Sequence, residues 1–146
     1  MKVRPSALII ENNHVLLLRY NYGGHDVLAL PGGNPDRGET LIQTIERELF
    51  EELQITTEVS DLIFMGEVLL PEVKNDVLHC VFIAKIIGGI PVLNPKETTA
   101  LEIVWKNIMT LHQHNLYPNV SDAIQDLMLT GSVAPYLGKI QQQYFG

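Results

Sequence analysis

Three glutamates, Glu48, Glu51 and Glu52, have the spacing of neighbours on one side of a helix. Positions three and four apart lie on adjacent turns, and carboxylates there repel by a few tenths of a kcal/mol per pair. A hard cation between the oxygens relieves this repulsion, and clustered carboxylates suit Mg²⁺, Mn²⁺ or Ca²⁺ rather than a soft metal. The alternative is a solvated acidic face, which is ordinary for paired glutamates. The spacing is therefore compatible with a metal site and with a charged surface.

The segment that carries these acids has the pattern of an amphipathic helix. No Gly or Pro occurs from Glu39 to Met65. The apolar residues recur at steps of three and four and are Leu41, Ile42, Ile45, Leu49 and Leu53. This periodicity predicts a helix from about Leu41 to Leu53, with Thr40 as its N-cap. The three acids border the apolar stripe, so we expect them at the rim of the core, beside a cleft.

The segment from Gly33 to Ile55 resembles the signature of a known family. It reads Gly, five residues, Glu, seven residues and Arg-Glu-Leu-Phe-Glu-Glu-Leu-Gln-Ile, which is similar to the signature of the Nudix hydrolases. The matching positions are Gly33, Glu39, Arg47, Glu48, Leu49, Glu51, Glu52 and Ile55. One fixed position departs, because Gln54 stands where the family has Gly. Helices often end there in a left-handed residue, so Gln is expected to cost on the order of 1 kcal/mol without affecting the chemistry.

The resemblance implies a fold and an activity. The implied fold is the α/β Nudix fold, a mixed central β-sheet sandwiched between α-helices, in a single domain over residues 1–146. The implied activity is divalent-metal-dependent hydrolysis of a diphosphate bond in a nucleoside diphosphate linked to another moiety. A (deoxy)nucleoside di- or triphosphate is the first expected substrate, and ADP-ribose or another nucleotide sugar is the second. An alternative of another class is a non-catalytic nucleotide-binding Nudix-like regulatory domain.

The resemblance also assigns roles to residues. The implied metal ligands are the carbonyl of Gly33 and the carboxylates of Glu48, Glu51 and Glu52, with Mg²⁺ as cofactor and Mn²⁺ as an alternative. Arg47 is expected to orient the glutamates by ion pairing, as an Arg fork suits. In the family a further glutamate from a loop after the main sheet often approaches the metal or activates water, and Glu97 is the first candidate and Glu102 the second. The general base is left open among three residues, Glu52, Glu97 and Glu102.

Candidate substrate contacts lie outside this signature. Arg19, Tyr20 and Tyr22 end an apolar run ahead of Gly23-Gly24, where they would clamp a phosphate and stack on a base. An ordinary strand end with exposed polar tips explains the same pattern. Arg37, in the loop before the helix, is either a solvated charge or a substrate contact.

The rest of the chain reads mainly as strands and turns. The expected strands are Ser6–Ile10, Val15–Tyr20, Val27–Leu30, Val59–Leu70, Val77–Ile87 and Leu101–Trp105. A hairpin turn is expected over residues 11–14, and a loop over residues 71–76. A second helix is predicted with Ser121 as N-cap and Gly131 as its end. His79 is expected to be a hydrogen-bonded strand residue.

Composition bounds the partners and the compartment. The 146 residues suit one domain, and 46% hydrophobic with 18% charged residues excludes a disordered chain. The net charge of -7 and the lack of a basic run argue against a nucleic-acid polymer and for a small-molecule nucleotide. A lone cysteine, no long apolar stretch and no signal-peptide pattern favour a soluble, cytoplasmic protein without a membrane partner. Homodimers are common in the family, so a homodimer is an additional expectation.

Overall fold

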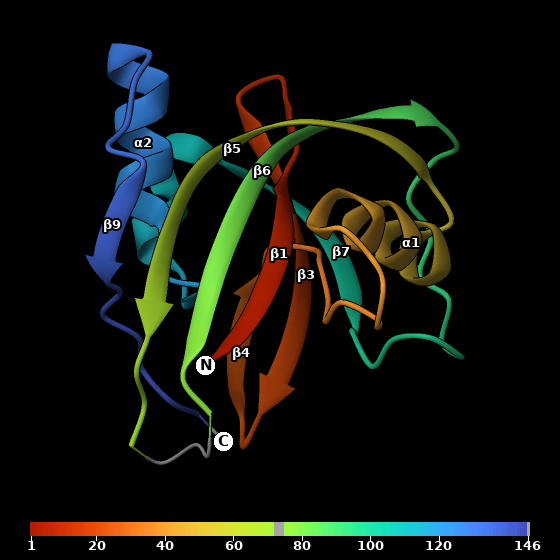
Figure 1. Ribbon diagram of the computed structural model, residues 1–146, viewed down its shortest axis with the longest axis horizontal. Coiled ribbons are helices and arrows are strands. Elements are labelled where there is room, and N and C mark those ends of the chain that lie inside the picture. The colour runs from red at the N-terminus through yellow and green to blue at the C-terminus, as the bar shows by residue number, and fades with distance from the viewer. Residues whose placement is uncertain (72–74, 146) are drawn as a thin grey trace.

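Two mixed β-sheets and two α-helices make up the described part, residues 1–71 and 75–145, of the computed structural model (Figure 1). In chain order the elements are β1 (Lys2–Leu8), β2 (Ile10–Glu11), β3 (His14–Tyr22), β4 (His25–Ala29), α1 (Leu41–Leu53), β5 (Thr56–Val68), β6 (Val77–Gly88), β7 (Glu102–Asn107), the 3-10 helix η1 (Ile108–Gln113), β8 (Leu116–Tyr117), α2 (Ser121–Thr130) and β9 (Tyr136–Lys139). In Figure 1, α1 lies on the right of the sheets and α2 on the left.

The strands divide between a four-stranded and a five-stranded sheet. The first has the order β1-β6-β5-β9, with β1 parallel to β6 and β9 parallel to β5. The second has the order β2-β3-β4-β8, and β7 pairs with β3 outside this path. Both sheets mix parallel and antiparallel pairs. The expected α/β class with mixed pairing is confirmed, and the strands are spread over two sheets.

The first apolar run does not form one strand. Lys2–Leu8 pairs with β6, whereas Ile10–Glu11 forms a hairpin with β3 in the other sheet. The prediction of a single strand over Ser6–Ile10 was therefore wrong, although the predicted turn is present. Asn12 and Asn13 hold φ of 50° and 61°, the left-handed backbone that a two-residue hairpin turn requires.

Side chains alternate between two apolar cores, because successive strand residues point to opposite faces. On β1, Ala7 belongs to the core under α1, while Leu8 belongs to the core beside α2. On β3, Leu16 lies on the α1 side and Leu17 on the α2 side. The helix α1 contributes Leu49, which is fully buried. Burial of its apolar stripe fixes the orientation of α1, and this orientation holds the acids that border the stripe at the edge of the core.

Both ends of α1 lie where the sequence predicts them. The hydroxyl of Thr40 accepts a hydrogen bond from the Gln43 backbone N–H at 3.1 Å, and the Gln43 side chain accepts one from the Thr40 N–H at 2.9 Å. This reciprocal capping box satisfies two N–H groups that a helix start leaves open. At the other end, Gln54 holds the left-handed backbone, φ 58° and ψ 36°. The expected left-handed backbone at the departure from the family signature is confirmed.

The second half of the chain differs in detail. Ser121 is the first residue of α2 and not its N-cap, which is Val120 and has no side-chain capping bond. Gly131 ends the helix with φ 76°, as predicted. The loop predicted over residues 71–76 falls partly outside the described residues, since 72–74 are not described. Within the described ranges, no helix has the length and apolarity needed to cross a membrane.

His79 on β6 is buried without a hydrogen bond. Its side chain is 1% exposed, and neither ring nitrogen has a partner among the described residues. The ring instead packs edge-on against Tyr117, with centroids 5.0 Å apart. Burial, and secondarily the charge of Arg4, lowers the pKa of His79 to about 4. The strand position is confirmed, but the expected hydrogen bond is absent.

Candidate active site

The glycine turn before α1 is held against β1. The Gly33 N–H donates to the Pro5 carbonyl at 3.3 Å, and Gly32 forms an isolated bridge with Ser6. A Cβ on Gly33 would collide with the carboxyl group of Glu48. Gly33 is therefore required for close approach, since any side chain there would displace a carboxylate of α1.

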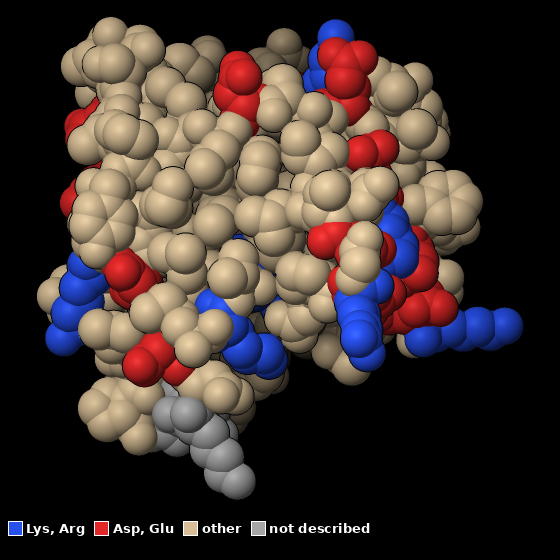
Figure 2. Space-filling model, in the orientation of Figure 1, with Lys and Arg blue, Asp and Glu red and all other residues tan. Residues whose placement is uncertain are grey.

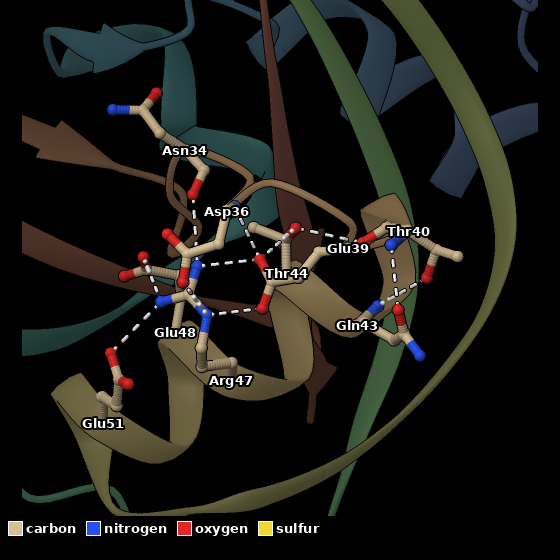
Figure 3. Close-up of polar contacts among 9 residues, drawn as sticks. All are labelled: Asn34, Asp36, Glu39, Thr40, Gln43, Thr44, Arg47, Glu48 and Glu51. Carbon is tan, nitrogen blue, oxygen red and sulfur yellow. Dashed lines mark hydrogen bonds and ion pairs between the residues drawn. The ribbon is translucent and has the colours of Figure 1, made fainter.

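Arg47 lies at the centre of the acidic cluster (Figure 3). Its Nη1 donates to Glu48 Oε1 at 2.9 Å and to Glu51 Oε2 at 3.2 Å. Its other nitrogens bind Glu39, Nε to Oε2 at 2.6 Å and Nη2 to Oε1 at 3.0 Å. Nη2 also donates to the Asn34 carbonyl at 3.2 Å. One guanidinium thus joins the loop to two helix carboxylates, the geometry expected of an orienting arginine.

The mixed charge of this cluster is visible at the surface. On the face drawn in Figure 2, acidic and basic side chains gather at the right, over α1 and the loop before it. The Arg47 guanidinium, followed by the Asp36 N–H, lowers the pKa of Glu39 to about 2. The hydrogen bonds that Arg47 donates to Glu39 in turn raise the pKa of Arg47. This pair therefore stays charged over the whole physiological range.

Glu52 faces a separate polar cavity. The cavity has a volume of about 300 Å³ and is lined by Tyr20, Glu52, Pro95, Lys96, Glu97, Thr98 and Thr99. The loop that contributes Pro95 to Thr99 to this cavity is hydrogen-bonded to the end of α1, because the Asn94 N–H donates to the Glu52 carbonyl at 2.9 Å. Of the two loop glutamates expected near the site, Glu97 lines this cavity and Glu102 does not.

Glu52 is the acid of this site whose pKa is raised most. Burial, then repulsion from Glu48, raises its pKa to about 7, and Glu51 and Glu97 add to the effect. Burial also raises the pKa of Glu48, against the opposing effect of Arg47. Glu48 and Glu52 thus lie in an environment of mutual negative charge, and a cation bound nearby would remove this repulsion.

The carboxylates do not converge into a closed metal site. Among the described residues, no group of three or more His, Cys, Asp or Glu side chains is gathered tightly enough to hold a metal ion. The reason lies in Arg47, which draws Glu48 and Glu51 toward itself. A cation at this position would have to compete with the guanidinium for both carboxylates.

A second, larger cavity, which we call the aromatic cavity, lies between residues of the two sheets. It has a volume of about 420 Å³ and is lined by Arg4, Tyr20, Tyr22, Val27, Ala29, Leu70, Tyr117, Gln142, Gln143, Tyr144 and Phe145. Tyr20 and Tyr22 stack with centroids 6.2 Å apart and planes 8° from parallel. Tyr20 also lines the polar cavity, so the two cavities adjoin at its ring. Flat aromatic walls of this kind suit a planar ring system.

The substrate candidates from the sequence separate into two groups. Tyr20 and Tyr22 line the aromatic cavity. Arg19 does not line either cavity, because it pairs with Glu102 at 3.1 Å and Asp26 at 3.4 Å. Cross-strand neighbours share a face, and Arg19 lies opposite Glu102 in the β3–β7 register, on the face that Tyr20 does not share. Arg37 is exposed in its loop and lines neither cavity.

Several cavity residues had no signal in the sequence. Arg4 and Tyr117 reach the cavity only because β1 and β8 pair with distant strands. The C-terminal residues Gln142–Phe145 also line the cavity. Gln142 anchors them, since its side-chain N–H donates to the Leu116 carbonyl at 3.1 Å and its oxygen accepts from the Asn119 N–H at 2.8 Å. No local periodicity encodes such pairings.

Comparisons with known proteins agree with this geometry. A family model described as the NUDIX domain matches residues 1–127. A protein of Methanocaldococcus jannaschii named ADP-ribose pyrophosphatase is 32% identical over 88 residues, which cover 60% of this chain and 52% of that protein. The chain therefore spans about half the length of the curated relative that it matches.

Solved structures share the fold. A NUDIX hydrolase from Nitrosomonas europaea superposes with a TM-score of 0.71 at 20% identity, covering 99% of this chain and 98% of that one. A MutT protein from Methanosarcina mazei gives a TM-score of 0.71 at 24% identity, covering 87% of this chain and 92% of that one. At these identities the likeness establishes the arrangement of strands and helices.

Proposed function

This chain belongs to the Nudix family, and on that premise we propose that it hydrolyses a diphosphate bond in a nucleoside diphosphate linked to another moiety. The first proposed substrate is a (deoxy)nucleoside di- or triphosphate. The observation that carries the proposal is the juxtaposition of the two cavities at Tyr20. One cavity contains Glu52 and Glu97, and the other offers aromatic walls. A nucleotide bound across them would have its ring among the tyrosines and its phosphates beside the acids.

The donor atoms present, carboxylate and backbone carbonyl oxygens, are of the kind that a divalent cation takes, and Nudix family members generally use such a cation. Gly33 leaves its backbone against Glu48, and the raised pKa of Glu52, caused first by burial and then by Glu48, reflects carboxylates in need of a counter-charge. We propose that Glu48, Glu51, Glu52 and the Gly33 carbonyl hold it, with Mg²⁺ first and Mn²⁺ as the alternative. A bound divalent cation neutralises phosphate charge and acidifies an attacking water.

Side chains of the protein would then orient the carboxylates and accept the proton of the attacking water. Arg47 holds Glu48 and Glu51 on one side of α1, which fixes where their oxygens point. Glu52 and Glu97 share the polar cavity, and one of them accepts the water proton. Glu102 is the weaker candidate, since its carboxylate is paired with Arg19.

A second candidate substrate is ADP-ribose or another nucleotide sugar. The M. jannaschii relative carries the name ADP-ribose pyrophosphatase, which favours this class. Both candidates contain a nucleoside 5′-diphosphate, so the same cavities serve either. They differ in what leaves, because a nucleotide sugar yields a sugar phosphate and a triphosphate yields inorganic phosphate or pyrophosphate.

We further propose that residues 1–146 act as one domain. The family match ends at residue 127, yet β9 pairs with β5 and Gln142–Phe145 line the aromatic cavity. The residues beyond the match thus complete both a sheet and the proposed substrate pocket.

A substrate panel tests the proposed activity. The purified chain is incubated with Mg²⁺ or Mn²⁺ and with nucleoside di- and triphosphates, ADP-ribose and sugar nucleotides, and the products are identified by mass. Cleavage within a diphosphate, abolished in Glu52→Gln and retained in Glu46→Gln, supports the proposal. Glu46 is an exposed acid of the same helix and serves as the matched control. Absence of turnover on the whole panel would favour the non-catalytic binding domain.

A further inference from the structure

Arg4 is the one charged residue among the described residues that line the aromatic cavity. Its side chain is half-buried on β1 and has no hydrogen bond or ion pair with any described residue. The other described lining residues are tyrosines, a phenylalanine, glutamines and aliphatic side chains. A cation at the wall of a cavity lined mainly by apolar and aromatic side chains suits a ligand that combines an apolar body with one anionic group.

The fold places Arg4 next to the glycine turn of the acidic site. The neighbouring residue Pro5 accepts the hydrogen bond from the Gly33 N–H at 3.3 Å. Gly33 in turn lies against the Glu48 carboxyl group. Arg4 therefore lies on the strand against which the glycine turn is held, one residue from the Pro5–Gly33 hydrogen bond.

The charge of Arg4 reaches groups of both cavities. It acts electrostatically on the carboxyls of Glu48 and Glu52 and on the hydroxyl of Tyr20, which lines both cavities. It also acts on Tyr117, which lines the aromatic cavity as well. No other arginine or lysine lines the aromatic cavity among the residues described. Within the described part of the lining, Arg4 is therefore the side chain that can pair with an anionic group of a ligand in the aromatic cavity.

We propose that Arg4 binds the 5′-phosphate next to the nucleoside and so orients the nucleotide, with its base in the aromatic cavity and its diphosphate toward Glu52. This inference rests on the proposed function for the direction of the diphosphate. The binding itself requires only a nucleoside 5′-phosphate and no metal. The guanidinium takes the role that the sequence suggested for Arg19, which the structure places in an ion pair with Glu102.

The inference is tested by calorimetric titration of the metal-free protein. The probes are AMP, GMP, CMP and UMP, each beside its unphosphorylated nucleoside. Arg4→Gln is compared with Arg4→Lys and with the control Lys2→Gln. Lys2 lies two residues away on the same strand, is exposed, and lines neither cavity, so its substitution removes an equal charge. Thermal melting of each variant establishes that it is folded.

We expect a loss of affinity that is confined to the phosphorylated probes. Arg4→Gln weakens the tightest-binding monophosphate by about tenfold or more, the effect of one charge-assisted contact, and changes its nucleoside by less than about twofold. Arg4→Lys restores part of the affinity, and Lys2→Gln matches the wild type. Unchanged monophosphate affinity in Arg4→Gln, an equal loss for the nucleoside, or a wild-type protein that binds none of the eight probes would overturn the assignment. If the pattern holds while the substrate panel shows no hydrolysis, the proposed function fails and the Arg4 site stands.

Discussion

Arg47 binds the carboxylate of Glu39 through two hydrogen bonds, donated by Nε at 2.6 Å and by Nη2 at 3.0 Å. Its remaining nitrogen Nη1 reaches Glu48 and Glu51. The loop acid and the helix acids are thus positioned by one planar group, which a lysine ammonium cannot imitate. Glu39 has its own anchors, because it accepts from the Asp36 N–H at 2.8 Å and from the Thr44 hydroxyl at 3.0 Å.

The first prediction concerns this pair. Glu39→Gln removes the charge that holds two nitrogens of Arg47, so the guanidinium loosens and Glu48 and Glu51 lose their fixed orientation. We expect turnover and divalent-metal affinity to fall by about tenfold to a hundredfold, the usual effect of removing a supporting partner. Steady-state kinetics and metal titration measure both quantities. Glu46→Gln on the exposed face is the control, and equal values for the two variants would contradict a supporting role for Glu39.

The second prediction separates the two acids of the polar cavity. If Glu52 binds the cation or accepts the proton, Glu52→Gln abolishes product formation. Its melting temperature is preserved or raised, because the substitution removes a buried carboxylate that neighbouring carboxylates repel. Glu97→Gln is expected to reduce turnover less severely if it only assists Glu52. Rates of the two variants on the best panel substrate provide the measurement. Full activity in Glu52→Gln would remove this helix from the mechanism.

Prediction from sequence succeeded where the signals are local. The bounds of α1, its Thr40 cap and the left-handed Gln54 all follow from apolar periodicity and end chemistry within one segment. The placement of Glu48, Glu51 and Glu52 follows from the same helix. The ion pairs of Arg47 with Glu48 and Glu51, which the family resemblance implied, are present as well.

Prediction failed where distant strands pair. Arg19 was a candidate substrate contact or an ordinary strand end, and its ion pair with Glu102 depends on the β3–β7 register, which involves residues far along the chain. Arg4 reaches the cavity because β1 pairs with β6 and not with the neighbouring strand β3. The break at Ile9 between two sheets is hidden in a continuous apolar run, so periodicity alone could not find it.

The third prediction concerns the end of α1. Gln54 holds φ 58°, which costs a residue with a Cβ on the order of 1 kcal/mol relative to Gly. Its side-chain amide donates to the Val92 carbonyl at 3.3 Å, an exposed bond that offsets only part of this cost. Gln54→Gly should therefore raise the melting temperature slightly and leave turnover unchanged. Gln54→Ala keeps the strain and loses the bond, so it should lower the melting temperature; a clear drop for Gly as well would refute this account.

The fourth prediction tests the C-terminal wall of the aromatic cavity. Phe145 packs on His25 with ring centroids 4.9 Å apart and lines the cavity with Tyr144. If a base stacks there, Phe145→Ala raises KM by about tenfold with little change in kcat, since stacking is worth about 1–3 kcal/mol per base. Leu129→Ala removes an exposed apolar side chain of α2 and is the control. A fall in kcat at constant KM would show that Phe145 acts on the chemistry instead.

The fifth prediction is a pH dependence of stability centred on His79. Its pKa is about 4 in the folded protein, lowered first by burial and then by Arg4, against an ordinary value of 6.5. Between these pH values the His79 imidazole is protonated in the unfolded chain and neutral in the folded chain. The free energy of unfolding is therefore highest above pH 6.5, as far as His79 is concerned, and decreases as the pH falls toward 4. By this linkage the loss between pH 7.5 and pH 5 amounts to roughly 2 kcal/mol.

His79→Phe isolates that contribution, because it retains an aromatic ring against Tyr117 and has no titrating group. Denaturant unfolding at pH 7.5 and at pH 5 should show a smaller difference in unfolding free energy for the variant than for the wild type. Other groups that titrate in this range cancel in the comparison, since they are common to both proteins. The exposed His112 provides the control, and His112→Phe should keep the wild-type difference. An equal pH dependence in wild type and His79→Phe would mean that the buried imidazole is not what weakens the fold in mild acid.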